Sequence, residues 1–169
     1  MKDSTLPLCT IMIPTFNQEK YLERAIMSAL DQDYPNLQVI VADDASTDKT
    51  RELLTSINDL RLCWHTNTAN LGRVANYRDL LVHHAQGQWV VNLDGDDFFI
   101  DPTFISSAIR AVRSNPDTVI VFADRYEFQD PVPKIIPERR AETARPELMQ
   151  GMEYILSWPK TKTRIHQLT

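Results

Sequence analysis

The chain has 169 residues, of which 43% are hydrophobic and 24% are charged, and its net charge is −5 at pH 7. These proportions are typical of a globular domain, and a chain of this length can bury one hydrophobic core. Proteins that bind nucleic acid are usually basic, so the acidic balance argues against a nucleic-acid partner. It does not exclude a nucleotide ligand, because a metal ion can supply the positive charge.

The cysteines and the hydropathy of the chain indicate the cellular compartment. Cys9 and Cys63 each lie inside an apolar run, so we expect both thiols to be buried and reduced. No segment approaches the ~18 apolar residues of a membrane span, and residues 1–5 lack the apolar stretch of a signal peptide. These features predict a cytoplasmic protein, and they leave open a peripheral attachment to the inner face of a membrane.

Strands and helices are predicted to alternate up to residue 123. Uninterrupted apolar runs predict buried strands at 8–13, 37–42, 60–65, 89–93 and 118–123. Apolar residues at helical spacing predict helices at 18–32, 47–57, 73–84 and 102–112. Because the strands are apolar on both faces, helices should cover both sides of the sheet. The pattern therefore predicts an α/β domain with a mostly parallel sheet.

Local signals predict how the helices begin and which side of each is buried. Asn17 can cap the first helix, and Ser46 or Thr47 can cap the second. In the third helix the side chains expected to face the core are those of Val74, Tyr77, Leu80 and Leu81.

The chain changes character after residue 129. Residues 130–147 contain four prolines among charged residues, which predicts a loop, and residues 147–158 predict a short helix stopped by Pro159. We therefore divide the chain into a core over 1–129 and a second region over 130–169.

An acidic cluster follows the fourth predicted strand. Asp94, Asp96 and Asp97 come directly after the apolar run, where ligands of parallel sheets bind. Two carboxylates ~5 Å apart repel by roughly 3 kcal/mol at an effective dielectric constant of ~20. An oxygen-only ligand set suits Mg²⁺ or Mn²⁺, and the alternative is a solvated acidic turn.

Two common nucleotide-binding motifs are absent. No G-x-G-x-x-G follows the first strand, and the chain has no G-x-x-x-x-G-K-[ST] sequence, with only four glycines in total. A glycine-rich backbone therefore cannot hold phosphates here. A divalent ion at Asp94 and Asp96 is the natural substitute, because it would stabilise the charge that develops on a leaving diphosphate.

Four short motifs resemble family 2 glycosyltransferases in order and spacing. They are Ile-Pro-Thr-Phe-Asn at 13–17, Ala-Asp-Asp-Ala-Ser-Thr-Asp at 42–48, Asn-Leu-Gly-Arg at 70–73 and Leu-Asp-Gly-Asp-Asp at 93–97, which contains a D-x-D motif. The resemblance covers roughly residues 7–125 and corresponds to the nucleotide-sugar-binding part of that family. It implies the GT-A fold, a Rossmann-type α/β/α sandwich.

The resemblance also implies an activity. Family members transfer a sugar from a nucleotide-diphosphate sugar, here expected to be a UDP-sugar, to an acceptor hydroxyl with inversion of the anomeric centre. It implies a hexosyltransferase type that depends on Mn²⁺ or Mg²⁺. The expected acceptor is a carbohydrate or a lipid-linked molecule, as in polysaccharide biosynthesis.

The first two motifs are implied to bind the nucleobase. Pro14, Thr15 and Asn17 would line the base pocket, and Asp44 would accept a hydrogen bond from a uracil N–H. A carboxylate favoured by the helix dipole is the alternative interpretation of Asp44. The sequence departs from the family at Ala45, where a glycine is often found.

The other two motifs are implied to bind the diphosphate and the metal. Arg73 would lie near the diphosphate, although a solvated charge at a helix start explains it equally well. Asp94 would contact the ribose or the metal, and Asp96 would bind the metal directly. Asp97 would lie farther from the ion, and Asp43 could be a structural acceptor.

An inverting transfer also needs a general base, which the resemblance places in the C-terminal half of the family. No residue after 129 matches its motif; the carboxylates there include Glu138, Glu142, Glu147 and Glu153. We therefore expect the base to lie beyond residue 169 and the chain to be a donor-binding fragment that is inactive alone.

Three other interpretations stay open. The chain could be a non-catalytic nucleotide-sugar-binding domain of the same fold. A signalling receiver domain would use Asp43 and Asp44 with Asp94 as the phosphorylated residue, but its acidic pair should follow the first strand. A phosphohydrolase with a D-x-D-x-T nucleophile motif would need a threonine at Phe98.

Overall fold

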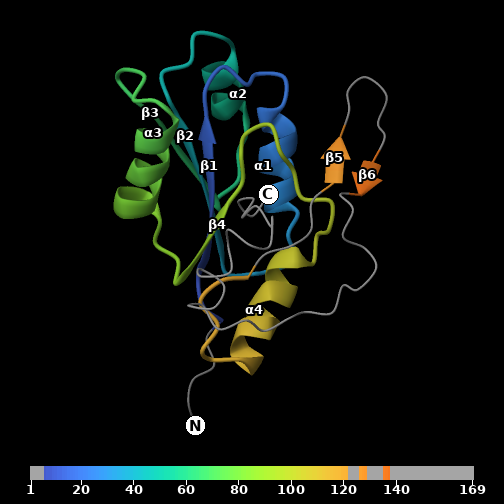
Figure 1. Ribbon diagram of the computed structural model, residues 1–169. Helices are drawn as coiled ribbons and strands as arrows, with labels where there is room; N and C mark the ends of the chain where they lie inside the picture. The colour runs from blue at the N-terminus through green and yellow to red at the C-terminus, as the bar shows by residue number, and fades with distance from the viewer. Residues whose placement is uncertain (1–5, 122–125, 129–134, 138–169) are drawn as a thin grey trace, which may run out of the picture.

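The structure is a computed structural model that describes residues 6–121, 126–128 and 135–137. Its centre is a parallel sheet with the strand order β3-β2-β1-β4 (Figure 1). The strands are β1 Cys9–Thr15, β2 Leu37–Asp43, β3 Leu62–Thr66 and β4 Trp89–Asn92. The parallel sheet predicted from the apolar runs is confirmed.

Helices cover both faces of this sheet, as the apolar strands require. They are α1 Leu22–Leu30, α2 Thr50–Ser56, α3 Arg73–Asp79, the π-helix η1 Leu80–His84 and α4 Phe104–Ser114. In Figure 1, α1 and α4 lie on one side of the sheet, while α3 lies on the other. The larger core cluster joins α1, α2 and α4 to one face, and a smaller cluster joins η1 to the opposite face.

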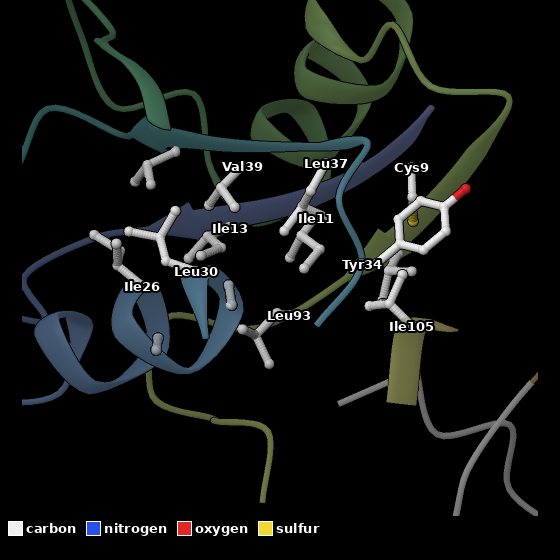
Figure 2. Close-up of a cluster of buried hydrophobic side chains, with 14 of the residues drawn as sticks. Cys9, Ile11, Ile13, Ile26, Leu30, Tyr34, Leu37, Val39, Leu93 and Ile105 are labelled. Atoms are coloured by element: carbon white, nitrogen blue, oxygen red, sulfur yellow. The ribbon is translucent and has the colours of Figure 1, made fainter. Parts of the chain in front are cut away.

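Alternate residues along β1 supply these two clusters, because successive side chains of a strand point to opposite faces. Ile11 and Ile13 pack with Ile26 of α1 in the larger cluster, which Figure 2 shows in close-up. Met12, between them, packs with Leu80 of η1 in the smaller one. Each burial of an aliphatic side chain contributes about 1.5–3 kcal/mol to the free energy of unfolding.

The predicted helix caps are wrong because the residues concerned join two loops to each other. Asn17 has a φ of 53° and accepts a hydrogen bond from the Thr47 backbone N–H at 2.8 Å, so it does not cap α1. Ser46 Oγ accepts from the Asn17 backbone N–H at 2.8 Å. At the start of α2, Asp48 Oδ1 accepts from the Thr50 N–H at 3.0 Å.

The helix predicted over 73–84 forms, but its buried side differs from the prediction. Leu80 is buried, whereas Val74 is 82% exposed and Leu81 is 52% exposed. Asn76 is buried instead, and its amide Nδ2 donates to the Ala42 carbonyl at 3.0 Å. The helix changes from α to π winding after Asp79, which changes the direction of the side chains that follow.

Two further predictions fail at the edges of the sheet. Cys9 is buried as expected, but Cys63 lies on the edge strand β3 and is exposed. The strand predicted over 118–123 is not a strand in its described part, 118–121. Val119 and Ile120 are 71% and 57% exposed there.

Two short strands follow that were not predicted. β5 Tyr126–Phe128 and β6 Ile135–Pro137 pair antiparallel, and β6 lies inside the segment predicted as a loop. The helix predicted over 147–158 lies outside the described residues. Within the part that is described, every helix is too short or too polar to cross a bilayer.

Candidate functional site

The carboxyl ends of the strands bring together the polar residues of all four motifs. β1 lies between β2 and β4, so the chain runs from β1 outward to β2 and β3 and then returns to β4 on the other side of β1. The loops after β1 and β4 therefore flank a topological switch point, where open parallel sheets bind their ligands. Thr15 ends β1, and Asp94 follows β4 by two residues.

The acidic loop after β4 gathers three carboxylates. One oxygen from each of Asp94, Asp96 and Asp97 lies within 4.8 Å of the others. The Asp97 backbone N–H donates to the Asp94 carbonyl at 2.9 Å, which closes a tight turn. Asp96 is exposed, whereas the other two residues are half-buried. The turn thus presents several acceptor oxygens to one point in space.

Arg73, at the start of α3, pairs with this loop. Its Nη2 lies 2.9 Å from Asp94 Oδ2. Burial raises the pKa of the Asp94 carboxyl, the Arg73 guanidinium lowers it, and the Asp96 carboxylate raises it again. The structure therefore places Arg73, a cation, beside the carboxylates where the sequence predicted a diphosphate.

The residues present fit a hard divalent ion. Asp94 Oδ1 is buried and has no hydrogen-bond partner in the structure, although an unsatisfied buried oxygen is costly. Its other oxygen holds Arg73, and further carboxylates stand within reach. Mg²⁺ and Mn²⁺ prefer such an oxygen ligand set.

Gln18 lies against this loop at Gly95, a contact that the sequence analysis did not predict. Thr15 Oγ1 donates to Gln18 Oε1 at 2.7 Å. A Cβ atom built on Gly95 would collide with Gln18 Oε1 and lie 3.0 Å from Thr15 Oγ1. A side chain at position 95 would therefore force Gln18 to move, because the end of β1 and the loop after it approach the acidic loop closely at Gly95. Only knowledge of which loops meet could have identified this contact.

Asp44 holds the loop before α3. It is 3% exposed, and its Oδ1 accepts from the Leu71 N–H at 2.8 Å and from Asn67 Nδ2 at 2.9 Å. Its Oδ2 accepts from the Gly72 N–H at 2.9 Å. A carboxylate offers about four acceptor positions, and the described residues occupy three of those on Asp44. The helix-dipole interpretation does not describe these contacts.

The other residues expected to line a base pocket differ in accessibility. Pro14 and Thr15 are buried, whereas Asn17 is exposed beside the loop after β2. Pro14 is tolerated in the central strand β1 because β4 pairs with β1 only as far as Met12. Asn17 and Ala45 both have positive φ angles, 53° and 61°, which L-residues rarely adopt.

The amide of Asn76 is a second contribution that the sequence analysis missed. Asn67 Nδ2 donates to Asn76 Oδ1 at 3.1 Å, and Asn76 in turn donates to Ala42. This chain of amides links α3 to the end of β2 and to Asp44. The carboxylates after residue 129 that were considered as a general base lie outside the described residues. The position of the general base therefore stays a prediction.

Comparison with known proteins shows where this arrangement recurs. The model of the family described as glycosyl transferase family 2 matches residues 10–167. The UDP-Glc:alpha-D-GlcNAc-diphosphoundecaprenol beta-1,3-glucosyltransferase WfaP of Escherichia coli is 33% identical over 109 residues, which are 64% of this chain and 43% of WfaP. TarS of S. aureus in complex with UDP-GlcNAc superposes with a TM-score of 0.65 and 27% identity, over 75% of this chain and 37% of the TarS chain.

A mannosyltransferase from Pyrobaculum calidifontis, PcManGT in complex with GDP-Man and Mn²⁺, has a TM-score of 0.59 and 29% identity. The match covers 68% of this chain and 34% of PcManGT. The chain spans 38–45% of the length of three further curated relatives. Its structural neighbours have the GT-A fold, which confirms the predicted fold class. The chain belongs to glycosyl transferase family 2.

Proposed function

We propose that this chain is the donor-binding part of a metal-dependent, inverting glycosyltransferase of the hexosyltransferase type that uses a UDP-sugar. One observation carries the proposal. The buried, unpartnered Asp94 Oδ1 lies with two more carboxylates at the switch point of a parallel sheet, within a site that also holds Arg73. That combination suits a divalent ion and a diphosphate.

The relatives support the donor and the metal. WfaP is named for transfer from UDP-Glc, and TarS binds UDP-GlcNAc. PcManGT binds GDP-Man together with Mn²⁺. We propose Mn²⁺ or Mg²⁺ for this chain, held by Asp96 and Asp94, with Asp97 alongside.

The chain's own residues would divide the work. A bound divalent ion stabilises the negative charge that develops on the leaving diphosphate. Arg73 would add a second positive charge at the same place, and Gln18 would keep the acidic loop in position. The fourth acceptor position of Asp44 would bind the uracil N–H, with Asn17 at the edge of the base pocket beside Pro14 and Thr15.

We propose an acceptor that is a carbohydrate or a lipid-linked molecule, presented at the cytoplasmic side of a membrane. WfaP supports the lipid-linked class, since its name gives a diphosphoundecaprenol acceptor. The acidic general base that inversion requires is proposed to lie outside residues 1–169, in the C-terminal half of the whole protein.

Calorimetric titration with UDP, GDP and dTDP, each with and without Mn²⁺, tests the proposal. We expect UDP to bind most tightly and only weakly without Mn²⁺. Asp96→Asn should abolish the effect of Mn²⁺, whereas Asp117→Asn, at an exposed aspartate outside the site, should not change it. Equal UDP affinity with and without the metal would contradict the metal assignment, and no nucleotide binding at all would contradict the donor site.

A further inference from the structure

A second cluster of possible metal ligands lies on α3, at the end away from Arg73. It consists of His65 on β3, Asp79 at the end of α3 and His84 at the end of η1, all half-buried. One ligand atom from each lies within 4.8 Å of the other two. Asp79 Oδ2 is 3.2 Å from His84 Nε2 and 3.6 Å from His65 Nε2. None of these residues belongs to the four family motifs.

The π-helix is what brings Asp79 and His84 together. They are five residues apart, and in an α-helix such residues point about 140° away from each other around the axis. In η1 the Ala85 N–H instead donates to the Leu80 carbonyl at 2.9 Å, which is the wider, five-residue winding of a π-helix. Short π-helical segments are rare in proteins, and those that occur are often found at functional sites. The local winding therefore has a visible consequence, which is to place an imidazole beside a carboxylate.

His65 supplies an independent sign that the cluster lacks a partner. Among the described residues its buried Nε2 atom has no hydrogen-bond partner, because the nearest carboxylate oxygen, Asp79 Oδ2, is 3.6 Å away. An unsatisfied buried nitrogen costs about 1–3 kcal/mol unless some group satisfies it. Burial first, and His84 second, lower the pKa of His65, whereas Asp79 raises it.

We propose that His65, Asp79 and His84 bind a divalent transition-metal ion of the Zn²⁺ class, which ties β3 to α3. Ligand atoms at Zn²⁺ distances around a tetrahedral ion lie about 3.4 Å apart, close to the two separations measured here. Two imidazoles and one carboxylate favour Zn²⁺, Co²⁺ or Ni²⁺ over Mg²⁺. Because the three residues are only half-buried, a water molecule can reach the fourth position.

The imidazole rings must rearrange when the ion binds. The rings of His65 and His84 stack with centroids 4.1 Å apart and planes 21° apart. Lone pairs in nearly parallel planes do not converge on one point, so one ring has to turn. His84 is the more exposed of the two, with 36% of its side chain accessible against 27% for His65, and it ends its helix. Metal binding should therefore move the His84 ring out of the stack.

The site differs from the acidic loop in position and in ligand chemistry. α3 carries Arg73, the partner of Asp94, at its first residue and Asp79 at its last, about 9 Å along the axis. The acidic loop offers oxygen ligands alone, whereas this cluster offers two nitrogens and one oxygen. The two sites should therefore prefer different ions, and the inference does not depend on the proposed sugar transfer.

Cobalt titration followed by visible absorption tests the inference. We expect one equivalent of Co²⁺ to give the intense visible bands of a tetrahedral ion, and Zn²⁺ to displace them. His65→Ala and His84→Ala should each weaken binding by more than about 100-fold, since even a hydrogen-bond partner of a ligand contributes about 10- to 100-fold. His83→Ala is the matched control, because His83 is exposed and next to His84. It should leave the titration unchanged.

Two further variants keep the test decisive. Asp96→Asn should retain the cobalt bands, which separates this site from the acidic loop. If His65→Ala or His84→Ala does not fold, the Asp79→Asn variant is titrated in its place. The amide of asparagine has nearly the same shape as the carboxylate but lacks its charge. Absence of saturable Co²⁺ or Zn²⁺ binding by the wild type would overturn the inference. Unchanged affinity in folded Asp79 and histidine variants would overturn it as well.

Discussion

Arg73 Nη2 lies 2.9 Å from Asp94 Oδ2, and this contact joins the start of α3 to the acidic loop after β4. The two residues are 21 positions apart in the sequence and belong to two different motifs. It leaves Asp94 Oδ1 buried and unsatisfied beside Asp96 and Asp97. A guanidinium cation and three carboxylates thus meet at one point, a combination that suits a metal and a diphosphate.

The raised pKa of Asp94 predicts how the stability of the metal-free protein depends on pH. Burial keeps the pKa of Asp94 above the ordinary value of an unfolded aspartate, about 3.9. The unfolded state therefore loses its proton first as the pH rises. The contribution of Asp94 is fully favourable below the ordinary pKa and is lost as the pH rises through the raised value.

Urea unfolding in the presence of a chelator, from pH 4 to pH 7, measures this dependence. Asp94→Asn should remove its part of the slope. In Arg73→Gln the loss of stability should extend to higher pH, because the guanidinium that lowers the pKa of Asp94 is gone. The control Arg78→Gln, at an exposed arginine on the same helix, should follow the wild type. Identical slopes for the wild type and Asp94→Asn would show that the folded protein does not raise the pKa of Asp94.

Gly95→Ala should disturb the acidic loop through Gln18. The new methyl group would collide with Gln18 Oε1, so we expect weaker Mn²⁺ and UDP binding, by about tenfold or more. The double variant Gln18→Ala/Gly95→Ala should recover part of that loss, because the flexible side chain that collides is gone. Additive effects in this double-mutant cycle would contradict the contact.

Ala45→Gly should stabilise the protein. The φ of 61° at Ala45 costs about 1 kcal/mol for an L-residue, and glycine removes that strain. We expect a gain of up to about 1 kcal/mol in the free energy of unfolding, measured by urea denaturation. Ala111→Gly, at an exposed position in α4, is the matched control and should lower stability by about 1 kcal/mol. A loss of stability in both variants would contradict the strain at residue 45.

Asp44→Asn tests whether the buried carboxylate supports the loop before α3. An amide has one acceptor oxygen, so it cannot accept from the Leu71 and Gly72 N–H groups and from Asn67 together. We expect a loss of about 1–3 kcal/mol in stability. Hydrogen exchange at the Leu71 and Gly72 amides should accelerate more than elsewhere. Unchanged exchange with altered nucleobase preference would assign Asp44 to ligand binding alone.

The sequence was sufficient for the layers of the fold, because strands buried on both faces must be apolar throughout. It was also sufficient to mark the acidic loop, because three carboxylates directly after an apolar strand are unusual, whereas Arg73 was singled out only through the resemblance to the family. The contacts of Asn17 and Asp44 could not be predicted from the sequence, because they depend on which loops meet across the sheet. Asp44 holds Leu71 and Gly72, which are 27 and 28 residues away.

Burial on α3 was misjudged for a related reason. Helical periodicity assumes α winding and a wide apolar contact, and it marked Val74 and Leu81 as buried. The helix meets the sheet through a narrower strip in which the amide of Asn76 replaces a hydrophobic side chain. The hydrophobic periodicity of the sequence does not reveal the π winding of η1.

We propose that the carboxylate of Asp96 and the unpartnered Asp94 Oδ1 hold a divalent ion that binds a nucleotide diphosphate. Anomalous diffraction from crystals grown with Mn²⁺ and UDP would locate that ion. We expect a manganese peak within ligand distance of Asp96 and Asp94, with the diphosphate of UDP on its open side near Arg73. A manganese peak elsewhere, or UDP bound away from the acidic loop with no metal beside it, would rule out this metal site.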